Sequence, residues 1–74
     1  MHKLTVLDVR GLACPLPVIR AQKIAKQIPG GQLKILCTDS GTKRDIPTWC
    51  RLNQHELIET AEVDGEIHFV VRIN

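Results

Sequence analysis

Apolar and polar positions divide the first half of the chain into three elements. They alternate over residues 4–9 and again over residues 32–39, which predicts two β-strands. Between these strands, residues 15–28 place apolar side chains at a helical period. The Pro-Gly-Gly sequence at residues 29–31 ends the helix.

The second half contains one more helix and two more strands. Residues 40–55 form a loop that runs into a helix ending near His55. Residues 56–63 and 66–73 have strand character, and Asp64-Gly65 between them is a strong hairpin signal.

The start of the second helix has two possible positions. Thr42 followed by Asp45 resembles a capping box, but a helix that begins there carries Pro47 deep enough to lose a backbone hydrogen bond. With Asp45 as the N-cap, Pro47 falls in the first turn, where it costs nothing. We favour the second position.

The element order is therefore β-α-β-α-β-β. It predicts a parallel first strand pair, an antiparallel closing hairpin and hence a four-stranded mixed sheet. With both helices on one face, the fold class is an α/β (α+β) two-layer sandwich. The chain shows no repeat or linker, so residues 1–74 form a single domain.

Composition and charge exclude several classes of function. The formal charge is only +2, and the two aromatic residues, Trp49 and Phe69, leave little for base stacking, so we expect no direct nucleic-acid partner. The apolar runs are too short to span a bilayer, and no apolar signal-peptide core precedes Asp8. We expect a cytoplasmic protein that is a monomer when free and has no membrane partner.

The three cysteines do not form a recognisable framework. An odd count argues against paired disulfides, and Cys14, Cys37 and Cys50 lack the close spacing of a structural zinc site. The histidines are equally scattered, and we expect no cofactor and no metal. Cys37 shares an inward strand face with Leu33 and Ile35, which predicts a core position.

Cys14 occupies a position suited to chemistry. With Pro15 as the first helical residue, Cys14 is the N-cap, and Pro17 also lies harmlessly in the first turn. Gly11 lets the preceding backbone turn sharply. The positive end of the helix dipole favours a thiolate, so we expect a moderately lowered pKa. The residues alone leave two interpretations open, a reactive thiol or a small buried hydrophobe.

The first helix has an apolar stripe and an unusual opposite face. The stripe, which we assign to the core, consists of Val18, Ala21, Ile24, Ala25 and Ile28. Two aliphatic residues fall on the other side among cations, which suggests a docking patch for an acidic partner, although single exposed aliphatics are also common. The patch comprises Leu16, Ile19, Arg20, Lys23 and Lys26.

Two segments carry a family resemblance. "LDVRGLACPLPVIRAQKIA" and "TDSGTKRDIPTWC" closely resemble the TusA/SirA family of small sulfur-carrier proteins, and the similarity covers nearly the whole chain. The Cys-Pro-x-Pro motif and the Arg-Asp-Ile-Pro block are the most specific parts. Ser40-Gly41 departs from the pattern, because relatives more often carry Asp or Asn followed by Pro there, and this bears on partner identity.

The resemblance implies a sulfur carrier with Cys14 as its persulfide site. It implies a cysteine desulfurase or rhodanese-type donor and a DsrE-like acceptor, in a relay that ends in tRNA 2-thiouridine or serves sulfur metabolism. Such a protein is a sulfurtransferase-type carrier rather than a conventional multiple-turnover enzyme. Other relatives are linked to selenium handling or accompany membrane transporters.

Supporting roles follow for residues around the motif. Pro15 and Pro17 fix the helix entrance. Arg10 and Arg44 either stabilise the thiolate or persulfide or are surface charges. We assign Asp45 to a helix N-cap rather than to acid/base work, because a relay between thiols needs little proton transfer.

Other residues leave alternatives open. Cys50 is a packing thiol or a resolving thiol for Cys14, and the latter would make the chain a redox protein. A non-enzymatic regulatory module acting through the docking patch is a further alternative. We expect His55 to support the end of the second helix and His68 to be solvated.

Overall fold

The computed structural model describes residues 4–74, so His2 lies outside it, and it has the predicted element order. The elements are β1 (Leu4–Asp8), α1 (Leu16–Ala25), β2 (Gln32–Cys37), α2 (Thr42–Leu52), β3 (Glu56–Val63) and β4 (Glu66–Arg72).

The four strands form one mixed sheet in the order β1-β2-β4-β3. Strand β1 pairs in parallel with β2, and β4 pairs antiparallel with both β2 and β3. The closing hairpin turns at Asp64 and Gly65, whose φ angles are 50° and 79°. Two successive positive φ values are what an Asp-Gly hairpin turn requires, so this prediction is confirmed.

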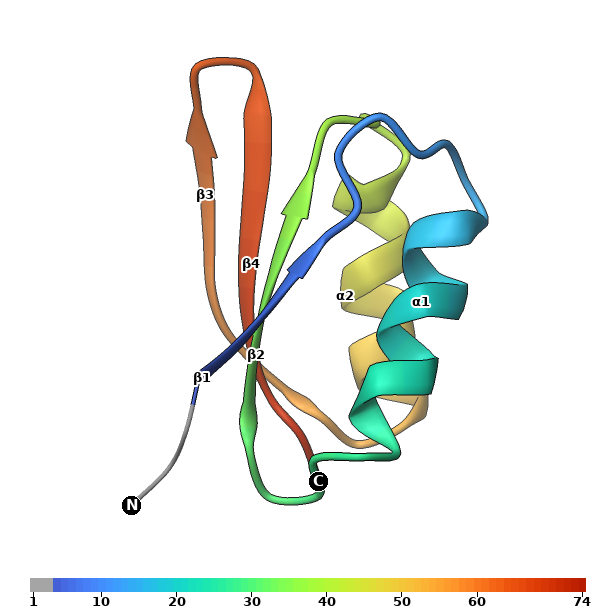
Figure 1. Ribbon diagram of the computed structural model, residues 1–74, viewed down its shortest axis with the longest axis vertical. Coiled ribbons are helices and arrows are strands. Elements are labelled where there is room, and N and C mark those ends of the chain that lie inside the picture. Colours follow the sequence, from blue (N-terminus) through green and yellow to red (C-terminus); the bar gives the residue numbers. More distant parts are fainter. Residues whose placement is uncertain (1–3) are drawn as a thin grey trace.

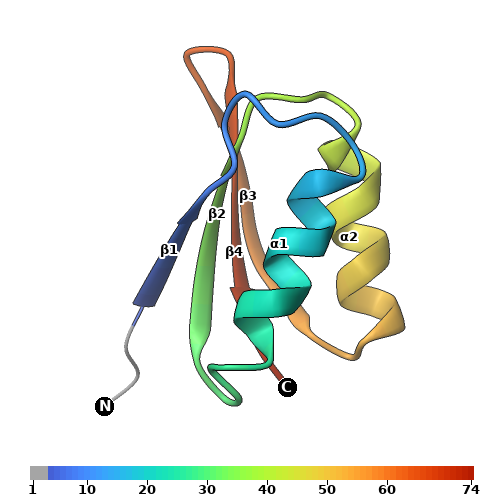
Figure 2. The same cartoon turned by 45° about the vertical axis from the view of Figure 1, so that its right-hand side comes forward.

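Both helices cover the same face of the sheet, which makes the predicted two layers (Figures 1 and 2). Phe69 of β4 and Leu33 and Ile35 of β2 are fully buried between the layers, together with Ile46 of α2. Cys37 is also fully buried, as its position on the strand predicts. Within residues 4–74, no helix has the length and apolar character needed to cross a membrane.

Helix α1 uses the predicted apolar stripe. Ala21 and Ala25 are buried, and Val18, Ile24 and Ile28 are half-buried against the core cluster. The helix is shorter than predicted, because it ends at Ala25 and the chain continues to Ile28 through tighter hydrogen bonds of the i to i+3 type.

The prediction that Pro15 opens α1 is wrong by one residue. Pro15 is the N-cap, with φ −99° and ψ 13°, and Leu16 is the first helical residue. The Leu16 N–H donates to the Ala13 carbonyl at 3.0 Å, which closes a turn around Cys14 and Pro15 before the helix begins. The peptide bond between these two residues is cis. Cys14 therefore precedes the N-cap.

The preferred start of α2 is also wrong. The helix begins at Thr42 with Gly41 as its N-cap, and Pro47 lies inside it. The Thr42 hydroxyl and N–H both donate to the Asp39 carbonyl, at 2.7 and 3.1 Å, and this contact ties down the first residue of the helix. Pro47 has no N–H to donate to the carbonyl one turn earlier, so the helix forms without that bond. The helix ends at Leu52, three residues before the predicted His55. Because Asp45 is not a cap, its side chain is free for another contact.

Candidate functional site

Cys14 lies exposed in the connection from β1 to α1. Gly11 turns this connection with a φ of 81°, a left-handed conformation that glycine adopts without strain, as the sequence predicts. Its N–H donates to Thr38 Oγ1 at 2.8 Å, which ties the connection to the residue that follows β2. The connection from β1 to α1 lies beside the start of α2 at this end of the sheet (Figure 1), and Cys14 contacts Asp45 of that helix.

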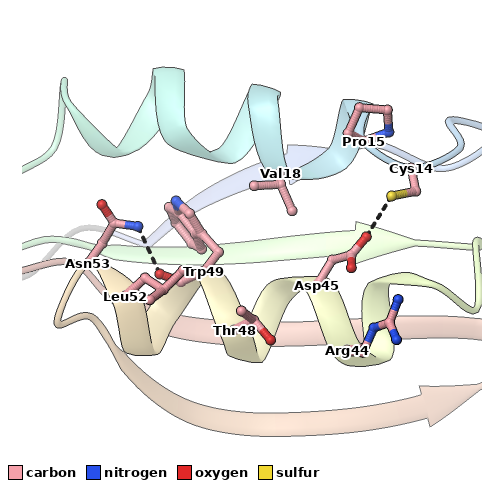
Figure 3. Close-up of a pocket in the computed structure, with 9 residues that line it drawn as sticks. All are labelled: Cys14, Pro15, Val18, Arg44, Asp45, Thr48, Trp49, Leu52 and Asn53. Atoms are coloured by element: carbon pink, nitrogen blue, oxygen red, sulfur yellow. Dashed lines mark hydrogen bonds between the residues drawn. The ribbon is translucent and has the colours of Figure 1, made fainter.

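Two carboxylates hold Cys14. Its Sγ donates a hydrogen bond to Asp45 Oδ2 at 2.7 Å, and the thiol points toward α2 (Figure 3). Its backbone N–H donates to Asp39 Oδ2 at 3.2 Å. Asp39 was not singled out by the sequence, and Asp45 was assigned to a cap. Both residues contact Cys14 across the fold instead.

This environment raises the pKa of Cys14, against the predicted lowering. The largest cause is the hydrogen bond to Asp45, followed by partial desolvation and by the negative charges of Asp45 and Asp39, while Arg44 acts in the opposite direction. At the start of α1, the Leu16 N–H is already bonded to the Ala13 carbonyl and Pro17 has no N–H.

A groove between α1 and α2 opens beside the thiol. It measures about 510 Å³. Its lining is Cys14, Pro15, Val18, Arg44, Asp45, Thr48, Trp49, Leu52 and Asn53 (Figure 3). Most of these side chains are apolar, and the Leu52 side chain is exposed at its rim. The groove gives an approaching protein an apolar surface directly next to Cys14.

Gly41 allows the loop before α2 to come close to the thiol. A Cβ at this position would lie 3.0 Å from Asp39 Oδ2 and 3.8 Å from the Cys14 Cβ. The Ser40-Gly41 departure from the family pattern therefore lies at the site, at the same end of the sheet as Cys14. Sequence reasoning noted the loop but missed the close approach of Gly41.

The two candidate arginines have different positions. Arg10 donates to Asp8 Oδ2 at 2.8 Å and to Glu66 Oε2 at 3.2 Å, so its charge serves an ion-pair network and not the thiol. This network lowers the pKa of Asp8 to about 2, mainly through the hydrogen bond from Arg10. Arg44 lines the groove, and its charge partly opposes the rise in the pKa of Cys14, so of the two arginines it is the one that acts on the thiol.

The other two cysteines are core residues. Cys37 is fully buried and Cys50 is 2% exposed. Burial raises the pKa of Cys50 to about 11, which makes it a poor resolving thiol. Among residues 4–74, no group of three or more His, Cys, Asp and Glu side chains could hold a metal ion.

The two histidines within residues 4–74 are structural. The His55 backbone N–H donates to the Cys50 carbonyl at 2.8 Å, and its ring packs on Trp49 and accepts from Asn74 N, so the predicted helix support comes from the backbone. His68 is half-buried and bonded to Glu66 at 2.9 Å, not fully solvated as predicted.

All five residues of the predicted docking patch on α1 are exposed, but only three of them line a common groove. Ile19, Arg20 and Lys23 line a second groove of about 550 Å³, together with Leu7 of β1 and Ile24. This groove lies between α1 and the edge strand, so it is separate from the groove beside Cys14.

Leu16 and Lys26 lie outside this second groove, although both are exposed. Arg20, Lys23 and Lys26 form no ion pair with any residue from 4 to 74. These residues therefore present unpaired positive charge beside exposed aliphatic surface within the described part of the chain.

The chain resembles known proteins along nearly its whole length. The model of the family "Sulfurtransferase TusA" matches residues 5–73. The chain is 43% identical over 68 residues to the sulfur carrier protein TusA of Pseudomonas aeruginosa, covering 90% of this chain and 86% of that protein. It is 43% identical over 67 residues to a putative sulfur carrier protein of Neisseria meningitidis, covering 89% and 90% of the two chains.

The fold also matches a solved structure. A SirA-like protein from Desulfitobacterium hafniense superimposes with a TM-score of 0.84 at 25% identity, covering 95% of this chain and 96% of the other. The family match spans nearly all the described residues, and its relatives are sulfur carriers. The chain therefore belongs to the TusA family of sulfur carrier proteins.

Proposed function

We propose that Cys14 carries sulfane sulfur as a persulfide between a donor persulfide and an acceptor thiol. The observation that carries this proposal is the contrast among the three cysteines. Cys14 alone is exposed, at the rim of an apolar groove, whereas Cys37 and Cys50 are closed off in the core.

The chemistry moves one sulfur atom without net oxidation or reduction. Cys14 Sγ attacks the terminal sulfur of the donor persulfide, a new S–S bond forms at Sγ, and the donor's S–S bond breaks with its electron pair on the donor sulfur. In the second step, the acceptor thiolate attacks the terminal sulfur of the Cys14 persulfide. The S–S bond to Cys14 breaks, and Sγ leaves with its electron pair. An exposed Sγ permits both attacks.

The surrounding residues support this role. Pro15 caps α1 and Pro17 is buried in its first turn, so the pair holds the chain rigidly just after Cys14. Gly11 provides the turn before it. Arg44 is the cation whose charge favours the ionised form of Cys14 or of its persulfide.

A sulfur carrier needs a donor protein and an acceptor protein. We assign the donor to the cysteine desulfurase or rhodanese type and the acceptor to the DsrE-like type. The relay then ends in tRNA 2-thiouridine or serves sulfur metabolism. The groove beside Cys14 suits an apolar segment that flanks a partner's own cysteine.

The docking patch defined by Leu16, Ile19, Arg20, Lys23 and Lys26 suits an acidic surface on one of these partners. The double variant Arg20→Glu with Lys23→Glu should slow loading by a cognate donor most at low salt, because steering between charges is screened by salt. Lys34→Glu, on the sheet, is the matched control and should load normally. Equal loading of the wild type, the double variant and Lys34→Glu would show that the docking patch does not bind the donor.

Loading by a cysteine desulfurase with cysteine tests the proposal. Intact-mass spectrometry should show the addition of one sulfur atom, and peptide mapping should locate it on Cys14. Cys14→Ser should take up none. Absence of an adduct with every donor tested, or equal adducts on Cys37 and Cys50, would contradict the proposal.

The same variant separates the alternatives. A regulatory module acting through the docking patch would keep its partner function in Cys14→Ser. A redox protein would form a reversible disulfide between Cys14 and Cys50, which non-reducing peptide mapping after mild oxidation would detect. The burial and the high pKa of Cys50 oppose that disulfide.

A further inference from the structure

Charged groups around Cys14 are arranged to oppose a thiolate. Asp39, in the loop after β2, accepts a hydrogen bond from the Cys14 backbone N–H. Asp45, on α2, accepts a hydrogen bond from the Cys14 thiol. Arg44, also from α2, supplies positive charge, and α1 has no acidic or basic side chain in its first turn. A thiol activated for nucleophilic attack ordinarily lies beside cations or a helix N-terminus with free N–H groups.

The contact with Asp45 is a short hydrogen bond in which the thiol is the donor and the carboxylate is the acceptor. Its Sγ to Oδ2 distance is 2.7 Å, and the carboxylate lies on a regular turn of α2 whose neighbour Ile46 is fully buried. Asp45 itself is half-buried, so the surrounding helix fixes its position. Within residues 4–74, neither the Cys14 thiol nor the Asp45 carboxylate makes a hydrogen bond to any other side chain.

We propose that Asp45 holds the proton of unloaded Cys14, so that the carrier meets its donor as a neutral thiol and not as a thiolate. The meaning of this role in a relay rests on the proposed function, whereas the protonation state does not. An unloaded carrier of this kind reacts slowly with oxidants and unrelated electrophiles, because the thiolate is the reactive form.

The proton then has a defined path during transfer. As Sγ bonds to the donor's terminal sulfur, its proton passes along the existing hydrogen bond to Asp45 Oδ2. The departing donor sulfur keeps the electron pair of the broken S–S bond and takes a proton from water. When the acceptor thiolate removes the sulfur, the electron pair of that bond returns to Sγ and Asp45 returns the proton. This role replaces the N-cap that the sequence assigned to Asp45, which the start of α2 at Thr42 contradicts.

The rate of Cys14 alkylation by iodoacetamide, measured from about pH 6 to about pH 10 on the full chain, tests the proposal. In Asp45→Asn the thiol should ionise at lower pH. At pH 7 its alkylation should be about three- to fourfold faster for each unit by which the pKa falls, because the gain in thiolate exceeds the loss of nucleophilicity. Above both pKa values the order should reverse, with the variant about threefold slower per unit. The two rate profiles should cross.

Matched variants separate charge from shape. Asp45→Glu keeps the negative charge, so its alkylation rate should follow the wild-type profile at both low and high pH. Arg44→Gln removes the cation and should shift ionisation of Cys14 to higher pH, opposite to Asp45→Asn. Cys14→Ser measures the background from Cys37 and Cys50. A structural role for Asp45 would raise alkylation at all pH values and expose those two cysteines as well.

The wild-type protein provides a test that needs no variant to fold. With ¹³C-labelled cysteine, the Cβ resonance of Cys14 should titrate above about 8.5, the ordinary pKa of a thiol. A midpoint below that value, or rate profiles that do not cross, would overturn the proposal. Neither measurement uses a sulfur donor, so failure to load sulfur would bear on the proposed function alone.

Discussion

The pKa values of Cys14 and Cys50 are both raised, but for different physical reasons. Cys50 is 2% exposed, and burial alone raises its pKa to about 11. Cys14 is exposed, and a hydrogen bond to Asp45 is the largest cause of its raised pKa. Burial can be removed only by unfolding, whereas a neighbouring carboxylate can accept the proton. One thiol is closed off in the core, and the other is accessible beside a carboxylate.

The largest contrast between the two should appear in sulfur loading. Cys14→Ser should lose all sulfur uptake from a cysteine desulfurase, because the serine hydroxyl cannot form a persulfide. Cys50→Ala should load to the wild-type extent. Intact-mass spectrometry of both variants after equal incubation measures the difference. Loss of sulfur uptake in Cys50→Ala, with uptake kept in Cys14→Ser, would contradict the prediction.

Alkaline pH should destabilise the fold through Cys50. Its pKa is raised in the folded state, so the stabilisation is complete below the ordinary thiol pKa and is lost as pH rises toward about 11. The loss attributable to Cys50 should reach about 2–3 kcal/mol. Urea unfolding of wild type and Cys50→Ala across this range measures it as the difference between two curves. Curves that stay parallel would show that Cys50 is not the group responsible.

Replacement by serine should separate the two positions by stability. Cys50→Ser places a hydroxyl in an apolar core and should cost about 1–3 kcal/mol. Cys14→Ser keeps an exposed donor next to Asp45 and should stay within about 0.5 kcal/mol of wild type. The midpoints of urea unfolding give both values. An equal cost at the two sites would mean that Cys14 is a packing residue after all.

The smallest effect is expected at Gly41. Its added methyl group in Gly41→Ala would meet Asp39 Oδ2 at 3.0 Å, so the carboxylate must move and weaken its bond to the Cys14 N–H. Since alanine also stiffens the unfolded chain, stability should stay within about 0.5 kcal/mol. Alkylation of Cys14 at pH 7 should rise, by less than in Asp45→Asn. Ser40→Ala is the control and should change neither quantity.

Local signals were sufficient for the fold and for finding Cys14. The Asp64-Gly65 turn, the alternation along β2 and the apolar stripe of α1 each depend on residues close in sequence. The start of α2 was not decided by such signals, because Thr42 and Asp45 are both good helix-start residues. A contact between Thr42 and the Asp39 carbonyl favoured the earlier position.

The electrostatics of the site could not be predicted, because they depend on contacts across the fold. Asp45 and Cys14 are 31 residues apart in the chain, and only the packing of α2 beside α1 brings them together. Arg10 is close to Cys14 in sequence, yet its charge is taken by Asp8 and Glu66. The expected lowering of the Cys14 pKa rested on the dipole of α1, and the carboxylates that the fold brings to the thiol act in the opposite direction.

Discharge of a loaded carrier tests the central claim most directly. The full chain is loaded with ³⁵S from labelled cysteine, freed of the desulfurase and mixed in a single turnover with a DsrE-like acceptor. The account predicts that label leaves Cys14 and appears in equal amount on an acceptor cysteine, with none on Cys37 or Cys50. Label that stays on the carrier, or that leaves equally well from Cys14→Ser, would contradict it.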